Sequence, residues 1–307
     1  MLDRVEKKYP NQIGYIYALL SHLFFVSGHY FIQKASKHLN AVQVLYLIGI
    51  QLTTYNYFTL VAKKLSPYSP KPHTTKMLWL RGICGFIGGC FLLSGLPLVP
   101  LSEAVVLQMT TPAFTGILAV FLLSEVYDMR LLFTTLFSFI GVMLISKPDF
   151  IFGGSGSSGK AYDQKSLGII LLLITSVIAS FAQIIIKKLG DLSNPCTTAL
   201  YLGIAGVFGA PILQIMSGVN QIYLEDILHL AIVGVLRYAS HYFLNKSYAY
   251  GEAGKISLMF YSQVPFAYII DLIFVGTRPD FYSVIGSFSI FSCVFIMLHK
   301  QYKQSNR

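Results

Sequence analysis

The chain has 307 residues, of which 54% are hydrophobic and 12% charged, and its mean hydropathy is +0.62. Soluble globular proteins carry about 25% charged residues, so this composition excludes a soluble enzyme, a nucleic-acid-binding domain and a disordered scaffold. Apolar runs of about 20 residues are the length that crosses a bilayer as a helix. The sequence therefore predicts an all-α integral membrane protein that has the lipid bilayer as its surroundings.

Ten apolar runs are long enough to form membrane-spanning helices, and most of the connections between them are short and carry Pro, Gly or Asn. Two connections are longer, one at residues 63–76 and one at 147–165, which contains a Gly/Ser run. We predict ten transmembrane helices, at residues 12–34, 41–62, 77–97, 100–123, 130–147, 166–187, 195–217, 226–248, 253–275 and 281–299.

Membrane topology accounts for most of the net charge of +10. An even number of spans places both termini on one side, which then holds 15 of the 23 basic residues; the opposite side holds 6, and Arg81 and Arg237 fall inside spans. Basic residues concentrate in cytoplasmic loops. We therefore expect both termini on the cytoplasmic side or its topological equivalent, and no nucleic-acid partner.

The two halves of the chain resemble each other on either side of the Gly/Ser linker. At an offset of 154 the matching pairs are Gly14 and Gly168, His29 and Gln183, Lys34 and Lys188, and Asn40 and Asn194. Each half holds five spans, so the second half enters the membrane in the opposite sense. Such inverted repeats are typical of transporters that bind substrate near the midplane. We predict a first repeat at 1–147, a linker at 148–165, a second repeat at 166–299 and a polar tail at 300–307.

Several short motifs carry a family resemblance. The first half reads LPLVPLSEAVVL at 96–107, TPAF at 111–114 and LLSE at 122–125; the second reads AGKISL at 253–258, QVPFA at 263–267 and VG at 275–276. These motifs resemble the EamA-type repeat of the drug/metabolite transporter superfamily, and they are similar to the G-type members of the solute carrier 35 group. The resemblance implies ten helices in two inverted five-helix repeats, a transport function, and a common place for Arg81 early in the third helix.

The resemblance has two departures. Thr277 follows Gly276 where the family usually has Gly-Glu, whereas the first half has the glutamate at the corresponding position, Glu125. In the last helix, Cys293 stands where a Gly is frequent. The family's Glu is expected to cap or orient a helix end. Its loss in the second half is either neutral or a sign of relaxed constraint on transport.

Polar groups within spans are the first candidates for a substrate site, because they are costly in lipid. His22 and His29 share a face of the first span, and Gln183 mirrors His29 in the second half. Helix–helix hydrogen bonding explains such residues equally well for His29 and Gln183, and better for His22.

On the eighth span, Arg237, His241 and Asn245 recur every four residues and share a face. A cationic face inside a bundle suits an anionic or zwitterionic substrate, and we favour this interpretation. The alternative is a structural ion pair with Glu103 or Asp271, since an unpaired buried Arg is costly.

The mid-span prolines mark two further positions. Gln108 and Tyr261 lie within about one turn of Pro112 and Pro265, and a proline bends a helix and frees backbone carbonyls that can line a cavity. Packing against neighbouring helices is an equally good explanation. Glu103 and Lys255 occupy equivalent helix entries; with Glu125 and Asp271 they are candidates for gates or helix-end anchors.

The sequence thus predicts a secondary transporter of a small polar metabolite, either an organic anion, an amino-acid-like solute or a nucleotide-linked one. The substrate-binding candidates are His29, Arg81, Gln108, Gln183, Arg237, His241 and Tyr261. We expect no catalytic motif, cofactor or metal. The alternative is a transporter fold that serves as a structural subunit of a larger membrane complex. The sequence also allows the protein to form a homodimer. The plasma membrane or an endomembrane is favoured, with the mitochondrial inner membrane as the alternative.

Overall fold

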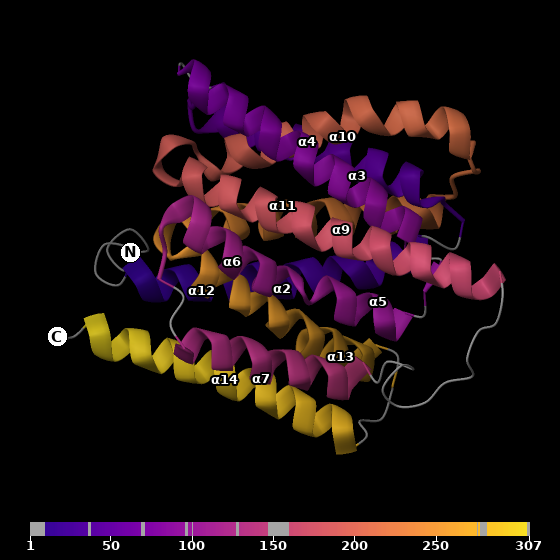
Figure 1. Ribbon diagram of the computed structural model, residues 1–307. Coiled ribbons are helices and arrows are strands. Elements are labelled where there is room, and N and C mark those ends of the chain that lie inside the picture. Colours follow the sequence, from indigo (N-terminus) through magenta and orange to yellow (C-terminus); the bar gives the residue numbers. More distant parts are fainter. Residues whose placement is uncertain are drawn as a thin grey trace.

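The computed structural model of this chain describes residues 10–35, 38–68, 71–95, 98–99, 101–126, 129–146, 160–274, 276 and 281–305. The described residues form ten helical spans packed in one bundle (Figure 1), as predicted. Eight spans are uninterrupted: α2 (Pro10–Ala35), α3 (Ala41–Ala62), α4 (Pro72–Gly95), α7 (Met129–Ser146), α9 (Lys160–Leu189, followed by the 3-10 turn η2, Gly190–Leu192), α10 (Pro195–Ser217), α11 (Leu224–Tyr250) and α14 (Phe281–Ser305).

The length and composition of these spans suit a bilayer. Seven of the described segments are long and apolar enough to cross a membrane, and α7 and α14 each contain a shorter apolar helix. The outer surfaces of the bundle carry many exposed large apolar side chains, as lipid-facing helices do. The protein is therefore a multi-pass membrane protein.

The fourth and ninth spans are each interrupted in the middle. The fourth consists of α5 (Leu101–Gln108) and α6 (Thr111–Leu123); the ninth consists of α12 (Ala253–Leu258), the 3-10 turn η3 (Met259–Ser262) and α13 (Gln263–Phe274). Pro112 and Pro265 lie in the first turns of α6 and α13, where a missing N–H costs nothing. The bends predicted at these prolines are therefore breaks that fall just before them.

Some predicted boundaries shift in the structure. Helix α9 begins at Lys160, inside the predicted linker, and α14 continues to Ser305, inside the predicted polar tail. Helix α4 begins at Pro72, before the predicted start at residue 77. The Gly/Ser run at 153–159 lies outside the described residues.

Helix packing follows the predicted symmetry between the halves. Helix α2 packs along α11, and their counterparts α9 and α4 pack along each other. The two remaining large contacts, α3 with α10 and α7 with α14, each join a helix to its own counterpart. Exchanging the halves maps this set of contacts onto itself, as an inverted repeat requires.

Local features repeat at the same offset. The Asn40 side chain accepts a hydrogen bond from the backbone N–H of Gln43 at 2.8 Å and caps α3, while the Asn194 side chain accepts one from Cys196 at 2.9 Å and caps α10. Asn is among the preferred N-cap residues because its oxygen satisfies a free N–H of the first turn. The pairing of Asn40 with Asn194 thus has the same structural cause in both halves.

Glycines bring α3 and α10 close together at the centre of this symmetry. A Cβ atom added at Gly203 would lie 2.7 Å from the backbone nitrogen of Thr53 and 3.0 Å from the oxygen of Gly49. Gly49 and Gly203 are themselves related by the offset of 154. Small residues at such crossings let helix backbones approach in a membrane.

Candidate functional site

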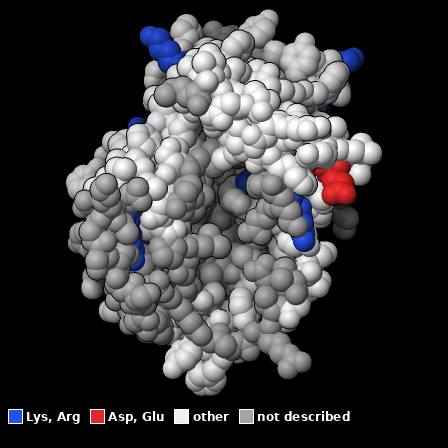
Figure 2. All heavy atoms as spheres, turned by 90° about the vertical axis from the view of Figure 1, so that its right-hand side faces the viewer, with Lys and Arg blue, Asp and Glu red and all other residues white. Residues whose placement is uncertain are grey.

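The bundle is closed at one end and hollowed at the other. The ends of α2 and α14 at Pro10 and Ser305 lie at the same end of the bundle, which we call the terminus face; the opposite end is the far face (Figure 1). Toward the terminus face α12 packs against α6, whereas their counterparts α5 and α13 show no comparable contact within the described ranges. Figure 2 looks onto the far face and shows a hollow at its centre with Lys or Arg atoms at its edge.

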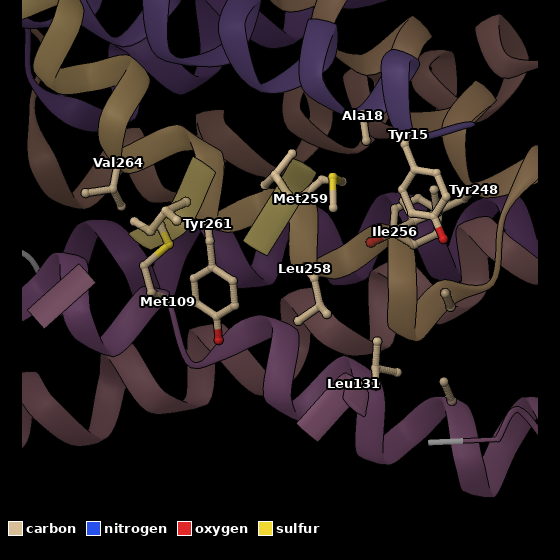
Figure 3. Packing of buried hydrophobic residues seen from close by; sticks show 14 of the residues in the cluster. Tyr15, Ala18, Met109, Leu131, Tyr248, Ile256, Leu258, Met259, Tyr261 and Val264 are labelled. Carbon is tan, nitrogen blue, oxygen red and sulfur yellow. The ribbon is translucent and has the colours of Figure 1, made fainter. Parts of the chain in front are cut away.

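A hydrophobic cluster closes the bundle beneath this hollow. It includes Tyr15, Met109, Tyr248, Leu258 and Tyr261, which come from the first, fourth, eighth and ninth spans (Figure 3). Met109 and Tyr261 come from the two helix breaks and lie beside each other. Tyr261, a substrate-site candidate from the sequence, is fully buried in this cluster, so in this conformation it packs rather than faces the hollow.

Arg237 is held within the bundle on α11. Its side chain is 8% exposed, and its guanidinium lies over the ring of Phe25, 4.0 Å from the ring centroid. The Nε atom is buried without a hydrogen-bond partner among the described residues. A desolvated cation over an aromatic face gains about 2 kcal/mol, and this contact does not satisfy the Nε–H donor.

Arg81 supplies a second buried guanidinium, from α4. Its side chain is 6% exposed and its Nε atom also finds no partner in the described part of the chain. Gly85, one turn further on, makes room for it, since a Cβ there would lie 2.5 Å from Nη1. Both guanidinium groups lie within electrostatic range of the His241 ring, whose Nδ1 atom is buried and unpartnered too.

No described carboxylate forms an ion pair with Arg81 or Arg237; the ion pairs among the described side chains are His38–Asp226 and Lys255–Glu252. The side chains of Glu103 and Asp271, the partners considered from sequence, lie outside the described residues. The site therefore concentrates positive charge and unused donors, an arrangement that attracts an anion.

His29 joins this site from α2. Its ring packs edge-on against Phe25 at 4.7 Å between centroids, the same ring that carries the Arg237 guanidinium. The His29 side chain is exposed in the bundle, unlike that of Arg237. The structure thus brings together His29, Arg237, His241 and Arg81, four of the predicted substrate-site residues.

Gln183, the counterpart of His29, lies deeper and is fully engaged in helix packing. Its Oε1 atom accepts hydrogen bonds from Thr115 at 2.8 Å and from the Tyr248 hydroxyl at 2.7 Å. It therefore links α9 to α6 and α11, as the helix–helix alternative predicted. Tyr248 itself lies within electrostatic range of Arg81, so this link adjoins the cationic site.

Three further polar residues also bond between or within helices. Asn245 donates from Nδ2 to the carbonyl of Pro195 at 2.9 Å and so does not continue the stripe of Arg237 and His241. His22 bonds to Gln263 at 2.8 Å, which ties α2 to α13. Gln108 is half-buried at the end of α5, where its carbonyl accepts the Thr111 hydroxyl at 2.7 Å.

Glu125 has a distinct position at the terminus face. Its two carboxylate oxygens accept hydrogen bonds from the backbone N–H groups of Ala253 at 2.7 Å and Gly254 at 2.9 Å. It thereby caps α12 across the boundary between the halves, and Ser124 before it adopts the left-handed conformation with φ of 56°. A carboxylate suits a helix N-terminus because it meets both the free N–H groups and the helix dipole.

The other predicted gate residues are less central. Lys255 pairs with Glu252 three residues earlier, with 2.6 Å between Nζ and Oε1, and this pair is partly exposed. Thr277, the counterpart of Glu125, lies outside the described residues.

Phe25 and Tyr248 belong to the site but were not predicted. Phe25 lies four residues before His29, and Tyr248 lies seven after His241, so helical spacing places each on the same face as a predicted residue. That spacing was the available signal. Aromatic residues are too frequent in this chain, with 20 Tyr and 23 Phe, for spacing alone to select them.

Comparisons with known proteins agree with this architecture. Residues 12–147 and 166–299 each match the EamA-like transporter family. The chain is 27% identical over 290 residues to mouse solute carrier family 35 member G1, covering 93% of this chain and 78% of that protein, and 27% identical over 306 residues to the human protein of the same name, covering 98% and 83%.

A probable transport protein of Saccharomyces cerevisiae is 25% identical over 340 residues, covering 99% of this chain and 94% of that one. A solved crystal structure superposes with a TM-score of 0.77 at 15% identity, covering 96% of this chain and 98% of the other, and shares the fold. These relatives indicate a transporter rather than an enzyme. The two family matches span most of the sequence, one in each half, and the chain therefore belongs to the EamA-like transporter family.

Proposed function

We propose that this protein is a secondary transporter that carries a small organic anion by alternating access. The observation that supports the substrate class is the pair of buried guanidinium groups, Arg81 and Arg237, without a carboxylate partner in the described residues. An unpaired buried cation costs several kcal/mol. A bound anion would remove that cost and use the free donors of Arg81, Arg237 and His241.

The chemistry of the site favours an anion with planar or tetrahedral oxygens, such as a carboxylate or a phosphate ester. A guanidinium presents its donors in a fixed fork that matches two oxygens at once. His29 and Phe25 add an aromatic wall beside Arg237, which suits an organic rather than an inorganic anion.

The asymmetry of the bundle supports alternating access. The contact of α12 with α6 closes the terminus face, and the symmetry-related contact of α5 with α13 would close the far face. In this proposal the transport cycle exchanges one contact for the other around the cationic site.

Uptake into proteoliposomes tests the proposal. The panel comprises mono-, di- and tricarboxylates, sugar phosphates, nucleotides, zwitterionic amino acids and uncharged polyols. For the anion that is carried, Arg237→Gln and Arg81→Gln are each expected to raise KM about 10- to 100-fold, the loss of a charge-assisted contact. Arg130→Gln is the matched control, because Arg130 is an exposed arginine on α7.

Uptake of polyols alone, unchanged by Arg237→Gln, would contradict the anion class. Failure of every solute with a correctly folded protein would contradict transport and favour the alternative of a structural subunit. In that case the native protein should co-purify in fixed stoichiometry with a larger membrane complex.

A further inference from the structure

A second cationic and aromatic cluster lies on the side of α11 between α2 and α3. Helices α2 and α3 both pack along α11 but do not pack extensively against each other within the described residues, so α11 lies between them and forms what we call the floor. Near the far face the two helices converge on a small cluster that includes Ala35, Val44 and Leu230. Toward the terminus face the floor between them is lined by aromatic rings.

These rings form a continuous stack along the floor. Phe24 stacks on Phe243 at 5.9 Å between centroids, and Tyr17 stacks on the same ring at 5.5 Å. Tyr242 meets Phe243 edge-on at 5.5 Å and stacks on Tyr238 at 6.4 Å. Phe24, Tyr242 and Phe243 are half-buried, so their outer surfaces stay accessible from the side of the bundle.

Two lysines stand over this aromatic floor at its terminus-face end. Lys63, the C-cap residue of α3, has its Nζ 5.5 Å from the Tyr242 ring centroid. Lys246, in the last turn but one of α11, has its Nζ 5.8 Å from the same ring and 5.0 Å from that of Tyr17. Both lysines therefore lie near the ring of one tyrosine, Lys63 from the end of α3 and Lys246 from α11 itself.

The depth of this cluster matches a lipid headgroup. Lys63 and Lys246 lie at the terminus-face ends of their helices, where long basic side chains extend to the membrane interface. Tyr and Trp are enriched at the same level. Basic pockets between transmembrane helices bind anionic headgroups, while an apolar floor running toward the membrane centre accepts an acyl chain.

We propose that the cluster of Lys63, Lys246, Tyr242, Phe243 and Phe24 binds one anionic phospholipid. The phosphate lies between the two ammonium groups, and an acyl chain runs along the rings of Phe243 and Phe24 toward the convergence of α2 and α3. Charge complementarity selects an anionic headgroup over a zwitterionic one. This cluster shares no residue with the cationic site, so the inference does not rest on the identity of the transported solute.

Native mass spectrometry of the full-length protein measures the binding directly. Delipidated protein is mixed with phosphatidylglycerol or phosphatidylcholine of identical acyl chains. We expect the first phosphatidylglycerol adduct to be retained about tenfold better than the phosphatidylcholine adduct. The reason is that each lysine near the headgroup favours an anionic lipid, and two of them together give a preference of about this size. Lys63→Gln with Lys246→Gln should abolish that preference.

Lys187→Gln with Lys188→Gln is the matched control, because both lysines lie in the last turn of α9 and the double change removes the same charge. Equal loss in this variant would mean diffuse attraction and overturn the proposal. Complete displacement of phosphatidylglycerol by inorganic phosphate would mean a simple anion site and also overturn it. If the double variant does not fold, Phe243→Leu should weaken retention of both lipids while keeping their ratio, and an unchanged retention would count against the cluster as the lipid site.

Discussion

The bidentate cap formed by Glu125 predicts how a single substitution changes the closure of the terminus face. In this structure Glu125 joins the end of α6 to the start of α12 and closes the terminus face. In the proposed transport cycle, opening that face separates α6 from α12, so the cap would exist in one conformation only. Glu125→Ala should therefore destabilise this conformation selectively.

The size of the effect follows from the two hydrogen bonds. Each joins a carboxylate oxygen to a backbone N–H, at 2.7 Å to Ala253 and 2.9 Å to Gly254. Glu125 is half-buried, so water replaces part of what is lost. A cap with a charged acceptor at a helix N-terminus contributes about 2 kcal/mol, which corresponds to about a 30-fold change in the ratio of the two conformations.

Cysteine labelling at Ala119 measures this ratio. Ala119 is 1% exposed on α6 and belongs to the cluster that packs α6 against α12. In a variant without the four native cysteines, Ala119→Cys should react with a maleimide about 30-fold faster when Glu125→Ala is added, at maleimide concentrations where opening and closing equilibrate faster than the labelling step.

Glu252→Ala is the control for charge at the same helix end. It removes a carboxylate that pairs with Lys255 on the surface, and such pairs contribute about 0–1 kcal/mol. Equal labelling rates for Glu125→Ala and the parent, or for Glu125→Ala and Glu252→Ala, would refute the reasoning.

Three other perturbations have defined outcomes. Gly203→Ala should destabilise the protein by about 1–3 kcal/mol, because the added Cβ would lie 2.7 Å from the Thr53 nitrogen. Gly206→Ala should be tolerated, because the nearest atom to its Cβ would lie at 3.4 Å. Thermal unfolding in detergent compares the two variants, and equal melting temperatures would contradict the close crossing of α3 and α10. Gln183→Leu leaves the Tyr248 hydroxyl without its acceptor and should cost about 1–3 kcal/mol, whereas the surface change Gln221→Leu should be neutral by the same assay. Phe25→Leu removes the ring beneath the Arg237 guanidinium, a loss of about 1–2 kcal/mol. If the protein carries an anion as proposed, this loss should raise KM for that anion about tenfold while kcat changes little. An unchanged KM would place Arg237 outside the substrate site.

Hydropathy and repeat spacing were sufficient to predict the ten spans, because a helix in lipid must satisfy its backbone internally and needs a minimum apolar length. The caps at Asn40 and Asn194 show why the offset of 154 was informative: each asparagine has the same local bond to make. The breaks at Met109 and at η3 were predicted only as bends. Their location depends on how the two interrupted spans meet in the core, a contact between segments far apart in sequence.

The candidate site was predicted in part for the same reason. Periodicity on α11 placed Arg237 and His241 on one face, but it could not separate them from Asn245, which turns toward the N-terminus of α10. His29 and Gln183 occupy equivalent positions in the two halves, but their side chains have different partners. Gln183 bonds across helices, whereas His29 packs edge-on against Phe25. Symmetry of the backbone does not extend to the partners of each side chain.

The guanidinium groups of Arg81 and Arg237, whose Nε atoms have no hydrogen-bond partner among the described residues, also offer a way to identify the ligand by its effect on stability. An anion that binds them in the folded state alone stabilises that state by RT ln(1 + [L]/Kd), or about 2.7 kcal/mol at a concentration of 100 Kd. In a thermal denaturation series each solute would then be ranked by affinity before any vesicle is made. An anion that pairs with several of the buried donors of Arg81, His241 and Arg237 should produce a larger shift in melting temperature than one that pairs with a single donor.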